Sequence, residues 1–380
     1  MNYLMRKILV AVCLTVLMLQ PTSAQQFKSD DWFPVRVNGK AGYIDRTGKV
    51  VLEPQFDGAS YFSEGLAVIS VGRNTIYTAG YSQGYIDETG AVVIKPQWDA
   101  TSSFSEGLAA VGFDQTKQEG KIGNRTYYTS SSHPWYLWGF IDKTGKTVID
   151  TKFSHVSEFR DGIAVANTEP NELKYGFINK QGNWIIQPQF EHANQFYEGL
   201  ARVFVIGKYG FIDKAGKMII KPKFSWAEDF SEGLACVKLG GDVVNPVGMS
   251  SIRHNADYAF IDHAGKIKFK VGRSGCKPFS DGFARVAIGG EHRVVDKSGK
   301  FAFDSSIDVW SEFSNGLAEI HLRGNEIGFI DREGKIIIRV PFGKASDFYN
   351  GLAEVCESYD FGAKCGYIDK TGKVIWEPTK

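Results

Sequence analysis

The sequence predicts an all-β protein, built as a tandem repeat array of about nine three-stranded antiparallel units. Two patterns and the composition support this prediction. A pattern of the form Gly-Phe-Ile-Asp-Lys-x-Gly-Lys recurs nine times, and a second pattern, Ser-Glu-Gly-Leu-Ala, recurs eight times. The chain also holds 42 glycines and is rich in Phe and Tyr, as is typical of many strands joined by tight turns.

The first 24 residues are predicted to form a secretory signal peptide and not to belong to the fold. Arg6 and Lys7 precede an apolar run from Ile8 to Leu19, and small residues follow it at a cleavage site before Gln25,. The run is short for a bilayer span, so an uncleaved anchor is the less favoured alternative. We therefore expect a mature domain of residues 25–380 without a membrane span, exported to the periplasm, the cell surface or the medium.

The charge balance argues against a nucleic-acid partner. Cleavage removes two of the 44 basic residues and none of the 43 acidic ones, so the mature chain is close to neutral. Binding to nucleic acid requires a basic surface, which this composition does not provide.

The spacing of the two patterns separates framework from loops. From each signature Asp, or from Asn179 in the fourth copy, the next Ser-Glu-Gly glycine always follows after 20 residues, as from Asp213 to Gly233. The return distance varies from 11 residues, between Gly199 and Gly210, to 32 residues elsewhere. Because exposed loops absorb insertions and packed elements do not, each unit has one variable surface loop.

Each unit is predicted to contain strands A, B and C. In the fifth unit, strand A is 200–206, strand B is the Gly-Phe-Ile-Asp run from Gly210, and strand C is 217–221. The variable loop joins A to B. The Asp-x-x-Gly turn between B and C fits a type I turn with a G1 bulge, in which the Asp side chain caps turn N–H groups.

A constant connector leads from strand C to the next unit. It carries two aromatic residues six positions apart, as at Phe153 and Phe159 or at Phe190 and Phe196. We expect the connector to cross the unit and to insert both rings between neighbouring sheets, since repeated exposed aromatics are unusual in soluble proteins.

The chain begins and ends on whole units. The first starts at a degenerate strand A, 33–37, and the last ends in strand C at 374–378, so no leftover strand completes a blade shared by the two ends. Closed propellers often share one unit in that way. We therefore favour an open, curved array stabilised by neighbour contacts, with a closed β-propeller-like ring as the alternative.

The repeat resembles the bacterial WG repeat, also called the KWG repeat. The stretch from Lys208 to Ala235 carries the resemblance most clearly, with Lys-Tyr-Gly-Phe-Ile-Asp-Lys-x-Gly-Lys followed by Phe-Ser-Glu-Gly-Leu-Ala. The Trp-Gly pair itself occurs once, at Trp138 and Gly139. The resemblance implies a β-rich scaffold, often in exported or multi-domain bacterial proteins, and it implies no established activity or catalytic residues.

Four cysteines remain in the mature chain. Cys356 and Cys365 flank one hairpin loop, and a disulfide between them is predicted for an exported protein; the pairing of Cys236 with Cys276 stays open. The sequence contains no C-x-x-C and no histidine pair at ligand spacing, so no metal and no cofactor are expected.

No reaction motif is present, and the histidines are spread over different units,. We therefore expect no catalytic residues and no enzymatic activity. Glu64, Glu106, Glu198 and Glu232 each precede a pattern glycine and are interpreted as repeated connector groups.

The best candidates for binding lie in the long A–B loops of two neighbouring units. These loops and the following residues contain exposed-type aromatic side chains suited to anchor a peptide or stack on a sugar: Tyr77, Tyr81, Tyr127, Tyr128, His133, Trp135, Tyr136 and Trp138. We expect a scaffold that binds protein or peptide partners, with a glycan or cell-wall module as the alternative. A third interpretation, that the loops only pack on themselves, stays open.

Overall fold

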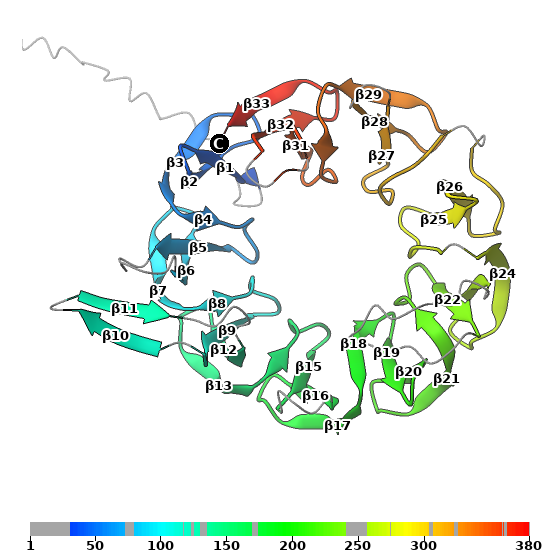
Figure 1. Ribbon diagram of the computed structural model, residues 1–380, viewed down its shortest axis with the longest axis horizontal. Coiled ribbons are helices and arrows are strands. Elements are labelled where there is room, and N and C mark those ends of the chain that lie inside the picture. The colour runs from blue at the N-terminus through cyan, green and yellow to red at the C-terminus, as the bar shows by residue number, and fades with distance from the viewer. Residues whose placement is uncertain are drawn as a thin grey trace, which may run out of the picture.

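In the computed structural model the repeats form a ring (Figure 1). The structure describes residues 31–72, 80–116, 118–122, 125–129, 135–168, 174–240, 257–273, 275–303, 307–322, 326–358, 360 and 363–379. The predicted signal peptide lies outside this part. Within it the protein is all-β, without an α-helix, and therefore holds no helix that could cross a membrane.

Strands A and B appear in all nine units as predicted, and strand C appears in eight. The A strands are β1 Phe33–Val37, β5 Leu66–Gly72, β9 Leu108–Asp114, β15 Ile163–Asn167, β19 Leu200–Val205, β22 Ala235–Leu239, β25 Phe283–Ile288, β27 Ala318–His321 and β31 Leu352–Cys356. The B strands are β2 Lys40–Ile44, β6 Tyr81–Asp87, β12 Tyr136–Asp142, β16 Tyr175–Asn179, β20 Lys208–Asp213, β23 Tyr258–Ile261, β26 Glu291–Asp296, β28 Ile327–Ile330 and β32 Cys365–Asp369. The C strands are β3 Val50–Phe56, β7 Val92–Trp98, β13 Thr147–Phe153, β17 Trp184–Phe190, β21 Met218–Ala227, β24 Ile267–Gly272, β29 Ile336–Val340 and β33 Val374–Thr379. In the seventh unit β25 and β26 form a two-stranded sheet, without a strand C among the described residues.

The connectors add short strands that the sequence did not predict. Each pairs antiparallel with the A strand of the next unit, as Gly58 does with Ser70. These strands are β4 Gly58–Ala59, β8 Ala100–Thr101, β14 His155–Val156, β18 His192–Tyr197 and β30 Lys344–Ala345. Several units are therefore four-stranded sheets. Between the fifth and sixth units β21 itself continues into this role and joins the two sheets.

The B–C turn has the predicted geometry. In the first unit the Gly48 amide donates to the Asp45 carbonyl at 3.0 Å, and Gly48 has φ +86°, a value that favours glycine,. The Asp45 side chain accepts hydrogen bonds from the amides of Thr47 and Lys49. Asn179 accepts the equivalent amides in the fourth unit, so the position serves the turn whether it holds Asp or Asn.

The Ser-Glu-Gly pattern is a second tight turn. Ser105 and Leu108 exchange both backbone hydrogen bonds around Glu106 (φ +53°) and Gly107 (φ +85°), and two residues with positive φ match a type I′ hairpin. The Glu106 carboxylate accepts the amide of Gly162 in the following unit at 2.8 Å. This connector role repeats for Glu64, Glu198 and Glu232.

The aromatic residues of the connectors are buried between neighbouring sheets, as predicted. Phe104 packs on Tyr85 of the preceding strand B with ring centroids 4.9 Å apart, and Phe159 packs on Phe140 at 4.7 Å. Phe104, Phe140 and Phe159 are each 1% exposed. Burial of a Phe side chain stabilises the fold by about 1.5–3 kcal/mol, so these layers hold each unit to the next.

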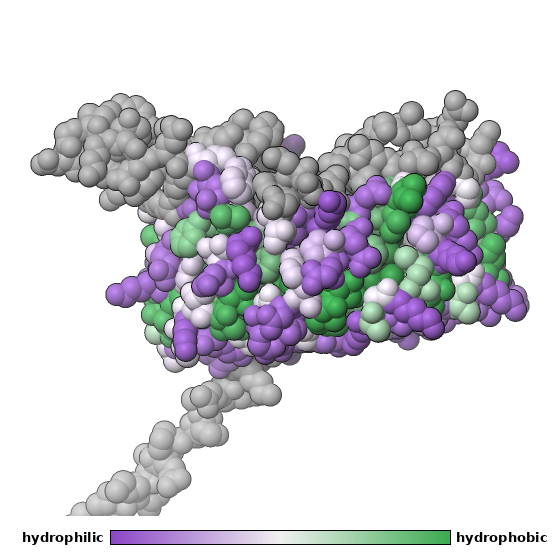
Figure 2. Space-filling view, turned by 90° about the horizontal axis from the view of Figure 1, so that it is seen from below, coloured by the Kyte–Doolittle hydropathy of each residue, from purple (hydrophilic) through white to green (hydrophobic). Residues whose placement is uncertain are grey.

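The outer strands are protected against pairing with other chains. β3, β7 and β17 are edge strands of their sheets and contain Pro54, Pro96 and Pro188. Proline has no N–H to offer to an added strand. Figure 2 views the ring from the side and shows apolar side chains interleaved with polar ones over this outer surface.

The favoured open array is wrong, and the alternative, the closed ring, is correct. A Cβ on Gly48 would lie 2.3 Å from the carbonyl oxygen of Ile375 in the last unit, just as one on Gly182 would lie 2.9 Å from Ile149 of its preceding unit. β1 and β33 belong to different sheets. Closure therefore needs no shared strand, because the last unit packs on the turn glycine of the first, as each earlier unit does on the next.

Candidate functional site

The structure describes half of the predicted binding residues at side-chain level. Tyr77 and His133 lie outside the described residues. Tyr127 and Tyr128 lie in β11 (Arg125–Thr129), which pairs with β10 (Gln118–Ile122), and their side chains are not part of the description. Figure 1 shows this hairpin extending away from the ring.

The other four predicted residues lie where β6 and β12 begin, at the A–B ends of the second and third units. Tyr81 is 48% exposed and Trp135 is 43% exposed. Tyr136 contacts Trp138 with ring centroids 5.5 Å apart. Trp138 lies over Gly112, where a Cβ would be 3.0 Å from its ring. The structure therefore brings Tyr136 and Trp138 together, whereas no aromatic contact within the described part of the chain links Tyr81 to either of them.

The position of Trp138, directly before the strand B glycine, holds aromatic or histidine side chains in the next four units. They are Tyr175, Tyr209, Tyr258 and His292. Because strand B starts beside the end of strand A, and because the connector strand pairs with that same end, each of these side chains meets connector residues. We call this set, together with the connector and strand A residues it contacts, the aromatic arc.

In the fourth and fifth units the arc is made of tyrosine and histidine. The Tyr175 ring lies 5.4 Å from His155 and 5.4 Å from His192, measured between centroids. Burial lowers the pKa of His155, and burial followed by the charge of Arg202 lowers the pKa of His192. Both imidazoles are therefore neutral at pH 7 and act as flat, weakly polar rings.

In the later units tryptophan enters the arc. Trp226 contacts Tyr209 at 5.9 Å and is 40% exposed. Trp310 stacks on His321 at 4.2 Å with the two planes 5° apart, meets His292 edge-on at 5.4 Å, and is 43% exposed. These partly exposed rings are the largest aromatic surfaces of the arc.

Sequence reasoning missed this part of the site. His155 and His192 are 37 positions apart in the chain, and His292 and His321 are 29 apart, so they looked scattered. His155 and His192 occupy equivalent connector positions of neighbouring units, and both contact Tyr175. His292 lies in a strand B and His321 in a strand A, and they meet through Trp310. An alignment of the units by register would have found the first pair but not the second.

The match to a known family agrees with this geometry. Six segments of the chain match the family described as WG containing repeat, and together they cover just over half of the chain: 42–74, 84–115, 138–169, 175–209, 209–241 and 327–358.

The chain belongs to the WG-containing repeat family.

Each matched segment starts at or near strand B and runs through strand C and the connector into the next strand A. No match was found among the curated proteins.

Solved structures similar to this WG-repeat chain include two with low sequence identity. One is described as a eukaryotic initiation factor, with 12% identity, a TM-score of 0.44, and coverage of 92% of this chain and 85% of that chain. Another is BamB from Moraxella catarrhalis, with 10% identity, a TM-score of 0.39, and coverage of 81% and 93%.

Recesses lie between WG units along the arc. One of about 320 Å³ is lined by His155 and His192 with Asn194 and Tyr197. A second, of about 240 Å³, lies between the sixth and seventh units and is lined by Trp226, Glu228, Tyr258, Gly275, Cys276, Lys277, Arg285, Ala287 and His292. Both offer ring faces beside hydrogen-bonding groups, an arrangement that suits binding.

Buried charge accompanies the arc. Arg202 lies 3.6 Å from Glu228 and 3.3 Å from Asp229, and burial raises the pKa of both carboxyl groups. Glu319 is 8% exposed and lies 3.2 Å from His321. Burial, and after it the charge of Asp347, raises the pKa of Glu319 to about 7.

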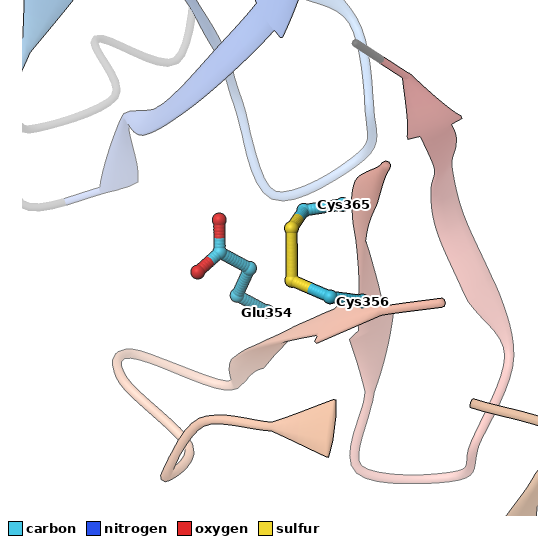
Figure 3. A group of neighbouring side chains, drawn as sticks. All are labelled: Glu354, Cys356 and Cys365. Atoms are coloured by element: carbon cyan, nitrogen blue, oxygen red, sulfur yellow. A yellow bond between two sulfur atoms is a disulfide. The ribbon is translucent and has the colours of Figure 1, made fainter. Parts of the chain in front are cut away.

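The predicted disulfide is present, and so is the pairing that the sequence left open. Disulfides connect Cys356 to Cys365 and Cys236 to Cys276. Among the described residues, Glu354, Cys356 and Cys365 form the one group close enough to hold a metal ion. Figure 3 shows both sulfurs of that group in the disulfide, so they are not available as thiolate ligands, and the group does not fit a metal.

Proposed function

We propose that this WG-repeat ring is a non-enzymatic scaffold that binds a protein or peptide partner along the aromatic arc. The observation that carries the proposal is the partial exposure of Trp226 and Trp310, 40% and 43%, each of which contacts another ring of the arc. Trp and Tyr are enriched where proteins bind partners, because a rigid ring buries much surface at low entropic cost.

The chemistry of the arc suits binding better than a reaction. Its histidines His155 and His192 have lowered pKa values and contact rings, and neither is hydrogen bonded to a hydroxyl or thiol in the described part of the chain. A general base would instead lie within hydrogen-bond reach of a nucleophile or substrate proton. The long A–B loops begin at this same end of the units, so Tyr81 and Trp135 extend the proposed surface.

Two further observations support export. All four cysteines outside the predicted signal peptide are paired in disulfides, and such bonds persist in oxidising compartments. Together with the predicted signal peptide, they favour the periplasm, the cell surface or the medium.

A capture experiment tests the proposed surface. Residues 25–380 are immobilised and incubated with an envelope extract of the source organism, and the retained proteins are compared for the wild type and for Trp226→Ala with Trp310→Ala. The matched control changes two exposed aliphatic residues of the outer strands, Ile185→Ala and Ile219→Ala. We expect specific retention by the wild type and the control and its loss in the tryptophan variant.

The fold of each variant is checked by thermal unfolding. Equal retention by a folded tryptophan variant would show that the arc is not the binding surface. A glycan array probed with the same proteins distinguishes peptide binding from glycan binding. Tryptophan-dependent binding to glycans, without retention of any protein, would favour a glycan or cell-wall module.

A further inference from the structure

The recess between the sixth and seventh units combines aromatic rings with two cationic side chains, Lys277 and Arg285. Trp226 and Tyr258 come from the sixth unit, whereas Arg285 and His292 come from the seventh. Its volume of about 240 Å³ is below the range of about 300–1,000 Å³ usual for small-molecule pockets. It has room for one side chain and not for a large ligand.

The cations of the recess are incompletely partnered. Lys277 is exposed and takes part in none of the ion pairs found in the described part of the chain. Arg285 donates one N–H to the carbonyl of Trp310, and its other terminal nitrogen lies 3.6 Å from the half-exposed Glu312. Its Nε has no hydrogen-bond partner among the described residues.

The opposing carboxylate is already engaged. Glu228 is the acidic residue in the lining, and Arg202 lies 3.6 Å from it. Burial raises the pKa of Glu228, whereas the charges of Arg202 and Lys277 lower it, so both cations act on this one carboxyl group. His292 faces Asp308, with Nδ1 and Oδ1 3.3 Å apart. The recess therefore holds an excess of hydrogen-bond donors and of positive charge, and an occupant has to supply acceptors.

The recess is held in shape by a covalent link. The disulfide between Cys236 and Cys276 joins strand A of the sixth unit to the connector of the seventh, directly before Lys277. The Lys277 amide also donates to the Arg285 carbonyl at 2.9 Å. A preorganised donor pair loses less conformational entropy on binding than a mobile one.

We propose that this recess binds the carboxylate of an Asp or Glu side chain in a partner peptide, with a neighbouring aromatic or apolar residue of the peptide on Trp226. The inference rests on the proposed binding function and specifies the chemistry of the partner. An acidic peptide side chain suits the site because its carboxylate is at the tip of a slender methylene stem. A uronic acid would have to bring its whole ring between the walls.

A selection experiment with defined probes tests this inference. A phage-displayed library of random twelve-residue peptides is selected on residues 25–380 in non-reducing buffer, in parallel with Lys277→Gln. The matched control is Lys268→Gln, which removes an exposed lysine on the outer strand β24 of the sixth unit. We expect the wild type and the control to enrich peptides with an acidic residue beside an aromatic one, and Lys277→Gln to lose this enrichment.

A double-mutant cycle then assigns the contact. The Kd of one enriched peptide and of its Glu→Gln counterpart is measured by fluorescence anisotropy on the wild type and on Lys277→Gln. Charge-assisted hydrogen bonds are worth more than neutral ones, so each single change should raise Kd about tenfold or more. Because both changes remove the same contact, the second should add little once the first is made.

The outcomes separate this inference from the function on which it rests. Enriched peptides that lack acids, or equal Kd values for Lys277→Gln and Lys268→Gln, would overturn the carboxylate assignment. If peptides without acidic residues bind the wild type but no longer bind Trp226→Ala, the proposed binding function stands and only the carboxylate assignment fails. Lys277-dependent binding of an oligosaccharide of alternating glucuronate and N-acetylglucosamine, with no peptide enriched, would overturn the assignment to a peptide.

Discussion

The hydroxyl of Tyr367 donates a hydrogen bond of 2.8 Å to the backbone carbonyl of Pro34, 333 positions earlier in the chain. The same oxygen lies 3.2 Å from the hydroxyl of Tyr61. Phe33 is 0% exposed and contacts the ring of Tyr367 with centroids 5.5 Å apart. The ring is thus closed by a seam of buried aromatic side chains between the last and the first unit.

The seam predicts a different cost for the same substitution at two turn glycines. Gly48 and Gly107 have nearly equal φ angles, +86° and +85°, but a Cβ on Gly48 would lie 2.3 Å from the Ile375 carbonyl oxygen, whereas one on Gly107 would meet nothing within 4 Å. Gly107→Ala should lower the free energy of unfolding by about 1–2 kcal/mol, the cost of a left-handed non-glycine residue. Gly48→Ala should cost clearly more, about 3 kcal/mol or above, because the backbone of the seam must move as well.

Chemical denaturation of both variants measures this difference. Equal costs at the two positions would mean that the first and last units are not packed together in solution.

The turn aspartates predict a contrast between Asn and Ala. Asp45 is 3% exposed and its Oδ1 accepts from Thr47 N, Thr47 Oγ1 and Lys49 N. Asp45→Asn keeps an acceptor, as Asn179 does naturally, and should cost less than about 1 kcal/mol. Asp45→Ala removes all three hydrogen bonds and should cost about 2–3 kcal/mol. Thermal unfolding of the two variants measures these losses of stability. Similar losses for both would contradict a capping role of the Asp45 side chain.

The two disulfides should differ in their contribution to stability. The pair Cys236–Cys276 spans 40 positions and Cys356–Cys365 spans 9. In the chain-entropy description the longer loop stabilises by about 4 kcal/mol and the shorter by about 2.5 kcal/mol. Replacing both cysteines of each pair by serine, and measuring urea unfolding, tests the order. A larger loss for the shorter loop would show that native contacts, and not loop length, determine the effect.

The buried Glu319 predicts a pH dependence of stability. Its pKa is raised to about 7 in the folded chain, compared with an unfolded value of about 4.3, so the folded state binds the proton more tightly. The resulting stabilisation is fully present below the unfolded pKa and is lost as the pH rises through about 7. Its full size is of the order of 3 kcal/mol.

The substitution Glu319→Gln isolates this effect. The difference in unfolding free energy between the wild type and the variant should change between pH 4.5 and 7.5 in favour of the variant at the higher pH. His321 lies 3.2 Å away, and its pKa is lowered chiefly by burial. Its contribution to stability therefore increases as the pH rises, opposite to that of Glu319, and His321→Gln serves as the companion control. A difference that is independent of pH would contradict a raised pKa at Glu319.

Much of the local architecture could be predicted because local interactions determine it. The spacing from Asp213 to Gly233 is constant since the B–C hairpin, strand C and the connector form one packed segment, and the turn glycine must take a positive φ. The connector aromatics, such as Phe159, were correctly placed between sheets because repeated exposed rings are disfavoured in water,.

The fourth strand was missed for a different reason. His155 and Val156 lie in the connector and pair with the end of β15 in the next unit. Nothing in the two-residue stretch itself favours a strand. It forms a strand only because the edge of β15 lies beside it in the folded protein, and this depends on tertiary packing and not on local sequence.

The sequence by itself determined the repeating unit, its turns and its buried rings, because these follow from backbone geometry and from burial within about 20 neighbouring residues. Only the tertiary structure decided that the ends meet at Tyr367 and Pro34, and that the separated His292 and His321 flank one indole. Closure depends on the small rotation between successive units, summed around the ring. Rotation of that kind arises from how side chains pack between sheets, and no single unit encodes it.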